Sequence, residues 1–261
     1  MPQIITRIGD DGDNPSAGAS RGDAVDRQRA LWPANVDDDE LGDAKALLGL
    51  LRPIAFESGQ LIFAEGDPGD DVYVIESGTA KIKRRGAGGR DNVIAIAGPG
   101  DIVGELSIFD PGPRTDTVVA ASDLQAGYLD RGTLRRFIAE RPALLQELLQ
   151  LLARQIKRRH DQLAAMAMTD VAGRVARQLL YLAAQFGAEG GSDVHVSVAL
   201  TDDEFADLVG SSGQTLSAIL RDLEDRSWIR RESAAIALVD RPALQRLASQ
   251  LSVDRDHPID P

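Results

Sequence analysis

The alternation of apolar and polar positions predicts strands in the first half of the chain and helices in the second. Between Pro53 and Asp130 the chain runs as short apolar or alternating stretches, such as QLIFAEG, DVYVIESG and NVIAIAGPGD, separated by turn signals rich in glycine and proline. Strands at such close, regular spacing predict a small all-β roll or barrel. The preceding stretch DDDELGDAKALLGLLR predicts a short helix that ends at Pro53, with acidic residues in its first turn and leucines along one side.

A long helical segment follows the predicted strands, from Gly132 to about Met168, and Pro142 stands where a first-turn proline is tolerated. Apolar side chains recur in this segment in alternating steps of four and three residues, with Arg159 as the one polar residue among them. This spacing pairs two helices along a seam and predicts a homodimer, and packing of the stripe on the chain's own β domain is the alternative. The seam residues are Leu145, Leu149, Leu152, Ile156, Leu163 and Met166.

The C-terminal part has the pattern of a winged helix-turn-helix. Asp170 caps a first helix, the glycine-rich stretch GAEGGSD predicts a loop, and VHVSV predicts a short strand. Thr201 and Glu204 form a capping box at the start of the next helix, which breaks at Gly210. A second helix and a hairpin made of WIRR and AIALV follow, which completes the pattern.

The composition excludes several classes of function. No apolar run is long enough to span a bilayer and the N-terminus has no secretory pattern, so we expect a cytoplasmic protein without a membrane partner. The chain has no cysteine, which excludes an iron–sulfur cluster held by thiolates, and its three histidines lack metal-like spacing, so no metal is expected. A net charge of −12 argues against nucleic-acid binding by the whole surface but allows a local cationic site.

The stretch GELSIFDPGPRTDT combines groups that suit a ribose phosphate. A glycine lets the backbone approach a ligand closely, and the free amides at the start of a helical turn attract an anion. The arginine and threonine beyond the turn suit a phosphate, and the glutamate suits a sugar hydroxyl. An ion pair between Glu105 and Arg114 that closes a turn without a ligand is the alternative. The predicted ligand residues here are Gly104, Glu105, Leu106, Ser107, Arg114 and Thr115.

Three motifs in register resemble the Crp–Fnr family of bacterial transcription regulators, and especially its actinobacterial members. GDIVGELSIFDPGPRTDT resembles the family's phosphate-binding cassette, and TDVAGRVARQLLYLA resembles its hinge and the first helix of its DNA domain. LTDDEFADLVGSSGQTLSAILRDLEDRSWIR resembles its helix-turn-helix. The similarity covers about residues 40 to 240. It implies a homodimer that senses a cyclic nucleotide and reads a palindromic operator in double-stranded DNA, with RNA polymerase as a candidate further partner.

The resemblance and the pattern together predict an α+β protein. Its function is expected to be sequence-specific transcription regulation under allosteric control by a ligand in the roll. The alternative is a nucleotide-sensing interaction protein whose DNA binding is weakened or lost. No nucleophile elbow or Walker-type loop is present, so an enzyme is not expected. The predicted parts are a disordered acidic tail (1–35), a jelly-roll cyclic-nucleotide-binding domain (36–131), dimerisation helices (132–168), a winged helix-turn-helix (169–252) and a tail (253–261).

The second helix of the motif departs from the family, which usually opens it with Arg-Glu-Thr and has another arginine further along. This chain has Gly213, Gln214, Thr215 and Ala218 there. Each good bidentate contact to a base is worth about 1–3 kcal/mol of discrimination, so we expect an operator that differs from the family's usual one. Gln214 and Ser217 are the expected base readers and the others are expected phosphate contacts. The full predicted set is Ser212, Gln214, Thr215, Ser217, Arg221, Arg230 and Arg231.

Arg159 and His160 stand where cyclic-AMP-binding relatives have a threonine and a small polar residue beside the adenine. An arginine donates but never accepts, so Arg159 favours guanine over adenine. Cyclic AMP, cyclic GMP and no cyclic nucleotide therefore remain open as ligands. Arg159 could instead pair with Asp161 of the partner subunit and leave the base site unaltered. Asp116 is expected to weaken phosphate binding, either by pairing with Arg114 or by repelling the anion.

Overall fold

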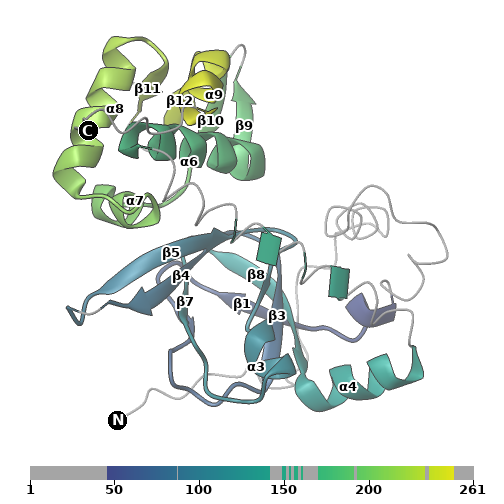
Figure 1. The fold of residues 1–261 in the computed structure, drawn as a ribbon. Helices are drawn as coiled ribbons and strands as arrows, with labels where there is room; N and C mark the ends of the chain where they lie inside the picture. Colours follow the sequence, from purple (N-terminus) through teal and green to yellow (C-terminus); the bar gives the residue numbers. More distant parts are fainter. Residues whose placement is uncertain are drawn as a thin grey trace, which may run out of the picture.

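The computed structural model describes residues 46–86, 88–141, 149–150, 153, 156–157, 160, 170–190, 193–232 and 235–249. The strand-rich half forms a β-roll, and the C-terminal part forms a separate helical domain with its own small sheet (Figure 1). The tails predicted over 1–35 and 253–261 lie outside the described residues.

The roll consists of two antiparallel four-stranded sheets, which confirms the predicted all-β domain. The first sheet has the order β1 (Arg52–Phe56), β8 (Leu124–Asp130), β3 (Asp71–Ser77) and β6 (Ile102–Val103). The second has the order β2 (Leu61–Phe63), β7 (Thr117–Ala120), β4 (Ala80–Arg85) and β5 (Asp91–Ala97). Inward residues of both sheets, among them Ile75, Leu124 and Val118, form one apolar core.

Two helices extend the roll. Helix α3 (Glu105–Phe109) follows β6, and helix α4 (Arg131–Glu140) follows β8 directly, with the Asp130 side chain accepting a hydrogen bond from the Thr133 backbone N–H. Of the helix expected before Pro53, the described residues begin at 46 and are helical at 46–48. Pro53 does not end it but lies in β1, where an edge strand tolerates a residue that lacks an N–H group.

The segment predicted as dimerisation helices begins with α4, and beyond Arg141 it is described at six positions, all of them helical. Leu149 and Ile156 are 57% and 56% exposed, which leaves these two apolar side chains uncovered within one chain. The other seam residues lie outside the described residues, as does Arg159, which interrupts the seam. They are Leu145, Leu152, Leu163 and Met166. The seam therefore stays a prediction.

The C-terminal domain is a winged helix-turn-helix, as the pattern predicts. Its helices are α6 (Val171–Phe186), α7 (Asp202–Leu208), α8 (Gly213–Asp225) and α9 (Arg241–Ser249). Its sheet has the order β11 (Ile229–Arg231), β12 (Ile236–Leu238), β10 (Asp193–Val196) and β9 (Gly187–Gly190).

The local signals at the helix starts are confirmed. Asp170 caps α6 and Thr201 caps α7, where Glu204 completes the capping box. The loop expected at GAEGGSD is wrong for residues 187–190, because they pair with β10 as strand β9. That pairing is a contact between strands, and the glycine-rich composition gave no sign of it.

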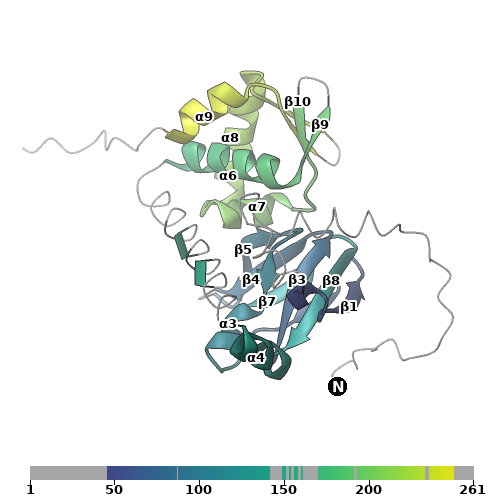
Figure 2. The same ribbon diagram turned by 90° about the vertical axis from the view of Figure 1, so that its right-hand side faces the viewer.

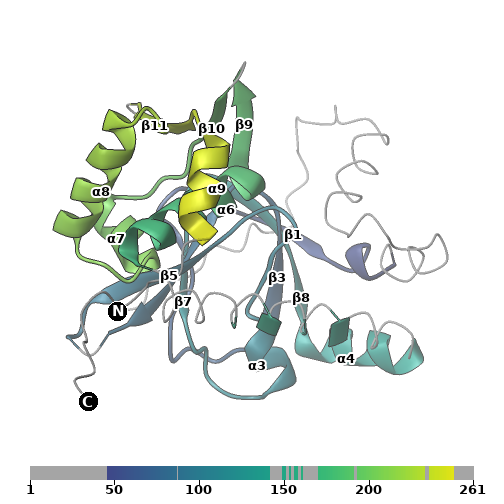
Figure 3. The same cartoon turned by 45° about the horizontal axis from the view of Figure 1, so that its top comes forward.

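The C-terminal domain rests on the second sheet of the roll, with α7 against β5 (Figure 2). Lys81 and Lys83 of β4 pair with Glu204 at 2.7 and 3.5 Å, and Arg90 pairs with Asp207. Val93 and Ile96 of β5 are buried in the same apolar cluster as the core of the C-terminal domain. In Figure 3, α7 lies next to β5, and α9 crosses in front of α6, on which it packs.

Candidate functional site

A cavity of about 290 Å³ opens between the roll and helix α6. It lies at the lower end of the size range of pockets that bind small molecules. The structure brings all six predicted ligand residues of the cassette to this cavity, although they come from α3 with its N-cap and from the chain between α3 and β7. They are Gly104, Glu105, Leu106, Ser107, Arg114 and Thr115.

Arg114 is the buried cation of the cavity, with 4% of its surface exposed. Its Nη1 donates to the Gly104 carbonyl at 2.9 Å and to Ser107 Oγ at 3.2 Å, and its Nη2 donates to the Asp71 carbonyl at 2.6 Å. The guanidinium also stacks 4.2 Å from the centre of the Phe63 ring. These contacts fix its orientation. Within the described part of the chain, the buried Nε has no hydrogen-bond partner.

The electrostatics of Arg114 favour an anion. Burial lowers the pKa of the guanidinium, and Tyr73 with the carboxylates of Asp71, Asp70 and Asp67 raises it in part. An arginine keeps its proton in proteins, so this burial costs solvation of a positive charge. A bound phosphate would offset that cost and would supply an acceptor for Nε.

Gly104 is needed for this arrangement. Its φ is +83°, a left-handed conformation that favours glycine, and a Cβ there would lie 2.5 Å from Arg114 Nη1 and 3.0 Å from the Asp71 carbonyl. The sequence predicted a close approach by a ligand at this glycine. The structure shows that the Arg114 side chain makes such an approach.

Asp116 lies in the cavity wall and is 8% exposed. It accepts hydrogen bonds from Arg84 Nε at 2.8 Å and from the Thr115 hydroxyl at 3.0 Å. The expected pairing of Asp116 with Arg114 is therefore wrong. Because β4 pairs with β7 in the register Lys83 opposite Thr117, Arg84 is the cation that lies beside Asp116.

The predicted DNA-reading residues lie on α8 and the following hairpin. Leu216, Leu220 and Leu223 are buried and seat the helix, while Gln214, Thr215 and Arg221 are exposed. Ser212 caps the helix, since its Oγ accepts from the Thr215 N–H at 3.2 Å and lies 2.9 Å from the Thr215 hydroxyl. Ser217 is partly buried.

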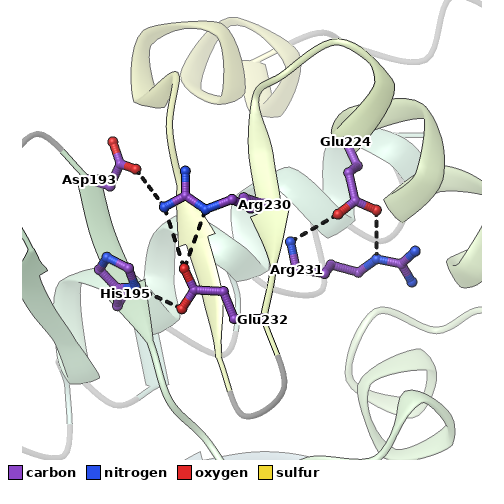
Figure 4. Close-up of polar contacts among 6 residues, drawn as sticks. All are labelled: Asp193, His195, Glu224, Arg230, Arg231 and Glu232. Atoms are coloured by element: carbon purple, nitrogen blue, oxygen red, sulfur yellow. Dashed lines mark hydrogen bonds and ion pairs between the residues drawn. The ribbon is translucent and has the colours of Figure 1, made fainter.

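The two wing arginines are held by carboxylates of their own domain (Figure 4). Arg230 pairs with Asp193 at 3.0 Å and with Glu232 at 3.4 Å, and Arg231 pairs with Glu224 at 3.0 Å. His195 Nδ1 lies 3.1 Å from Glu232. Sequence reasoning predicted the arginines but missed their partners, because only the fold brings Asp193 beside Arg230.

Sequence reasoning also missed three residues of α6 that line the cavity: Arg177, Gln178 and Tyr181. Their spacing of three and four residues was visible in TDVAGRVARQLLYLA, but nothing local connected it with the cassette. Arg159 lies outside the described residues. His160 is helical and exposed, and its predicted role stays a prediction.

Within the described ranges, no helix is long and apolar enough to cross a membrane. In the same part of the chain, no group of three or more histidine, aspartate and glutamate residues is placed to hold a metal ion.

A β-roll whose cassette lines a cavity, followed by a winged helix-turn-helix, defines a sensor-type transcription regulator. Residues 53–141 match the family described as cyclic nucleotide-binding domain, and residues 173–247 match the Crp-like helix-turn-helix domain. The chain belongs to the Crp–Fnr family of transcription regulators, which confirms the resemblance of its motifs. As a member of this family it is not an enzyme.

The curated relatives of the chain are regulators of the same kind. It is 46% identical over 203 residues to the CRP-like cAMP-activated global transcriptional regulator of Mycobacterium tuberculosis, covering 78% of this chain and 91% of the relative. It is 28% identical over 197 residues to the cyclic AMP receptor protein of Thermus thermophilus, covering 76% and 88%.

Solved structures share the fold. A CRP/FNR-family transcriptional regulator from Thermus thermophilus matches with a TM-score of 0.65 and 25% identity over 76% of this chain and 99% of its own. FixK2 from Bradyrhizobium japonicum matches in fold alone, with a TM-score of 0.68 at 20% identity over 77% and 98%.

Proposed function

We propose that this regulator binds a palindromic operator as a homodimer, and that a cyclic purine nucleotide in the roll controls this binding. The observation that carries the proposal is the buried Arg114, oriented by the Gly104 and Asp71 carbonyls and by Ser107 within the cavity. A fixed, desolvated guanidinium in a cavity of nucleotide size is suited to a phosphate.

The cassette supplies a contact for each part of the ligand's sugar phosphate. Arg114 Nε and the N–H groups of Leu106 and Ser107, at the start of α3, face the phosphate. The Glu105 carboxylate accepts from a ribose hydroxyl. Thr115 turns its hydroxyl from Asp116 to the phosphate when the ligand enters, which costs one hydrogen bond and gains another.

Residues outside the cassette determine which base the ligand carries. The relative from Mycobacterium tuberculosis is named as cAMP-activated, which supports cyclic AMP as the first ligand to test. Arg159 supports cyclic GMP instead, because a guanidinium fits the two acceptors of guanine. The two ligands are distinguished by titration.

The exposed seam side chains support the dimer. Leu149 and Ile156 are seven residues apart on a helix, so they lie on one face. A second copy of the chain covers them and sets two α8 helices at a fixed spacing, which suits a palindrome. A contact with RNA polymerase and a cytoplasmic location stay predictions.

Calorimetric titration with cyclic AMP and cyclic GMP tests the ligand. We expect one of them to bind with micromolar or higher affinity. Arg114→Gln should weaken this affinity about a hundredfold or more, and Arg135→Gln should leave it unchanged. Arg135 is an exposed arginine of α4 and controls for the change of charge. Because Arg114 is buried, its replacement also removes contacts that hold the fold. Ser107→Ala is therefore a second, milder variant, for which we expect a smaller loss of nucleotide affinity. Absence of binding of either nucleotide at millimolar concentration overturns the ligand proposal.

Selection of DNA from a random pool, with and without nucleotide, tests the operator. We expect an enriched palindrome that differs from the family's usual site. The carboxylates around Arg230 and Arg231 favour the alternative, an interaction protein that has lost DNA binding. A pool that shows no enriched sequence under either condition decides for that alternative.

A further inference from the structure

One stripe of helix α6 connects the ligand cavity with the turn of the helix-turn-helix. Arg177, Gln178 and Tyr181 line the cavity. Arg174, one turn earlier on the same stripe, donates from Nε to the Val209 carbonyl at 2.8 Å and from Nη2 to the Gly210 carbonyl at 3.2 Å. Positions three, four and seven residues apart share a helix face, so a single helix surface touches both places.

The opposite face of α6 anchors it in the DNA-binding domain. Val175, Ala176 and Leu179 are fully buried in the core that also holds Leu216 and Leu220 of α8. Close-packed side chains transmit a displacement without much deformation, so α6 and α8 move together. A group that pushes or holds the cavity side of α6 therefore acts on the recognition helix.

The contacts between the domains keep the stripe at the cavity. Glu204 of α7 pairs with Lys81 and Lys83, and Asp207 accepts from the Val93 backbone N–H at 3.3 Å. At the end of α6, the Phe186 ring packs against Gly98 so closely that a Cβ there would collide with it. The DNA-binding domain is thus docked with α6 as one wall of the cavity.

We infer that the DNA-binding domain contacts the ligand directly, with Tyr181 and Gln178 binding its base. The inference rests on the proposed nucleotide. Arg114 and the start of α3 take the phosphate, so the base, which the proposed function also places beside Arg159, is the part of the ligand within reach of α6. A phenol ring offers a stacking surface to any base, and an amide offers a donor and an acceptor to a purine edge. Arg177 is already committed in part, because its Nη2 donates to the Ala248 carbonyl at 2.8 Å.

Direct contact makes ligand binding and domain docking mutually dependent. A ligand that binds both the roll and α6 stabilises the docked arrangement, and by linkage the docked arrangement strengthens ligand binding. Arg174 then carries the effect to the turn that sets α8. Tyr181 and Gln178 determine ligand affinity, whereas Arg174 determines how far the ligand changes DNA binding.

Nucleotide titration of full-length variants tests the ligand contact. We expect Tyr181→Ala and Gln178→Ala each to weaken nucleotide binding about tenfold. Gln185→Ala is the matched control: Gln185 is an exposed glutamine of the same helix and does not line the cavity, so its loss is expected to change affinity less than about twofold. Tyr181→Phe keeps the ring and the fold and is expected to keep most of the affinity.

DNA binding measured with and without nucleotide tests the coupling. We expect Arg174→Gln to keep nucleotide affinity and to lose most of the nucleotide's effect on DNA affinity. The inference is overturned if Tyr181→Ala and Gln178→Ala bind nucleotide as the wild type does while Arg114→Gln does not bind it; the proposed function then stands. If the wild type binds no nucleotide, both the proposed ligand and this inference fail.

Discussion

Arg230 and Asp193 meet within the wing, where Nη2 of the arginine lies 3.0 Å from a carboxylate oxygen (Figure 4). The Asp193 side chain is 13% exposed, whereas Arg230 is 53% exposed and reaches solvent. Glu232 adds a second carboxylate at 3.4 Å. A DNA phosphate has to compete with these groups for the same guanidinium, so the wing carries its own anionic competitors.

Removing the exposed competitor is expected to strengthen DNA binding. Glu232→Gln frees Arg230 from one carboxylate and removes a negative charge near the phosphates. We expect a threefold to tenfold gain in DNA affinity at low salt. The slope of the logarithm of the binding constant against the logarithm of the salt concentration should become steeper by up to about 1. Filter binding at several salt concentrations measures both quantities.

Glu57→Gln is the control for that variant, because it makes the same change of charge at an exposed site on the roll. An equal gain in Glu57→Gln would show that net charge alone is responsible. Unchanged affinity in Glu232→Gln would show that Glu232 does not compete.

The exposed seam predicts the oligomeric state. We expect a dimer at micromolar concentration, and we expect Leu149→Lys combined with Ile156→Lys to yield monomers, because like charges would face each other across the seam. Sedimentation equilibrium distinguishes the two states. A monomeric wild type would refute the dimer and, with it, the fixed spacing of two recognition helices.

Gln214 and Arg221 are expected to contribute differently to DNA recognition. Both are exposed on α8. Gln214→Ala should relax the sequence preference at one base pair, since an amide reads adenine. Arg221→Ala should weaken binding to all sequences and reduce the salt slope by about 1. Competition between specific and random DNA separates the effects, and identical behaviour of the two variants would contradict the assignment.

The docking of the two domains is expected to depend on pH through Glu204. Burial alone would raise the pKa of this carboxyl, but hydrogen bonds from Lys81 and the Thr201 N–H, with the charges of Lys81 and Lys83, hold it below its usual 4.5. A carboxyl with a lowered pKa stabilises the folded state above its unfolded pKa, and this contribution is lost as pH falls through the folded pKa.

Urea unfolding of wild type and Glu204→Gln measures this contribution. We expect the variant to be less stable by about 0.5–1 kcal/mol at pH 7. Glutamine still fits the capping box, so the helix start is retained. The difference should shrink as pH falls below the unfolded pKa of the carboxyl and should disappear once pH lies below its lower folded pKa. A difference that stays constant as pH falls from 7 into the range where the carboxyl is protonated in both states would show that the ion pairs do not contribute.

The sequence alone predicts a structural feature correctly where the residues that determine the feature lie close together in the chain. The capping box of α7, the buried face of α8 and the cassette each lie within a short stretch, and the structure places their residues as expected. The contact between Lys81 and Glu204 spans 123 positions and has no local signal. The same holds for Arg84 with Asp116 and for Tyr181 at the cavity. Those arrangements follow from the pairing of strands and the docking of domains, which a single pattern of residues does not specify.

Strand β1 pairs with β8 at the far end of the roll, with Arg52 opposite Tyr128. The first sheet therefore depends on a contact between residues more than seventy positions apart. In contrast, α7, α8 and the hairpin pack on one another within a much shorter stretch of chain. Folding slows as the sequence separation of contacts grows. During refolding from denaturant, α7, α8 and the hairpin should therefore form before the roll does, whereas α6 and α9, whose contact between Arg177 and Ala248 spans 71 positions, should complete the DNA-binding domain later. For that interval the recognition helix would already be formed while the sensor domain is not.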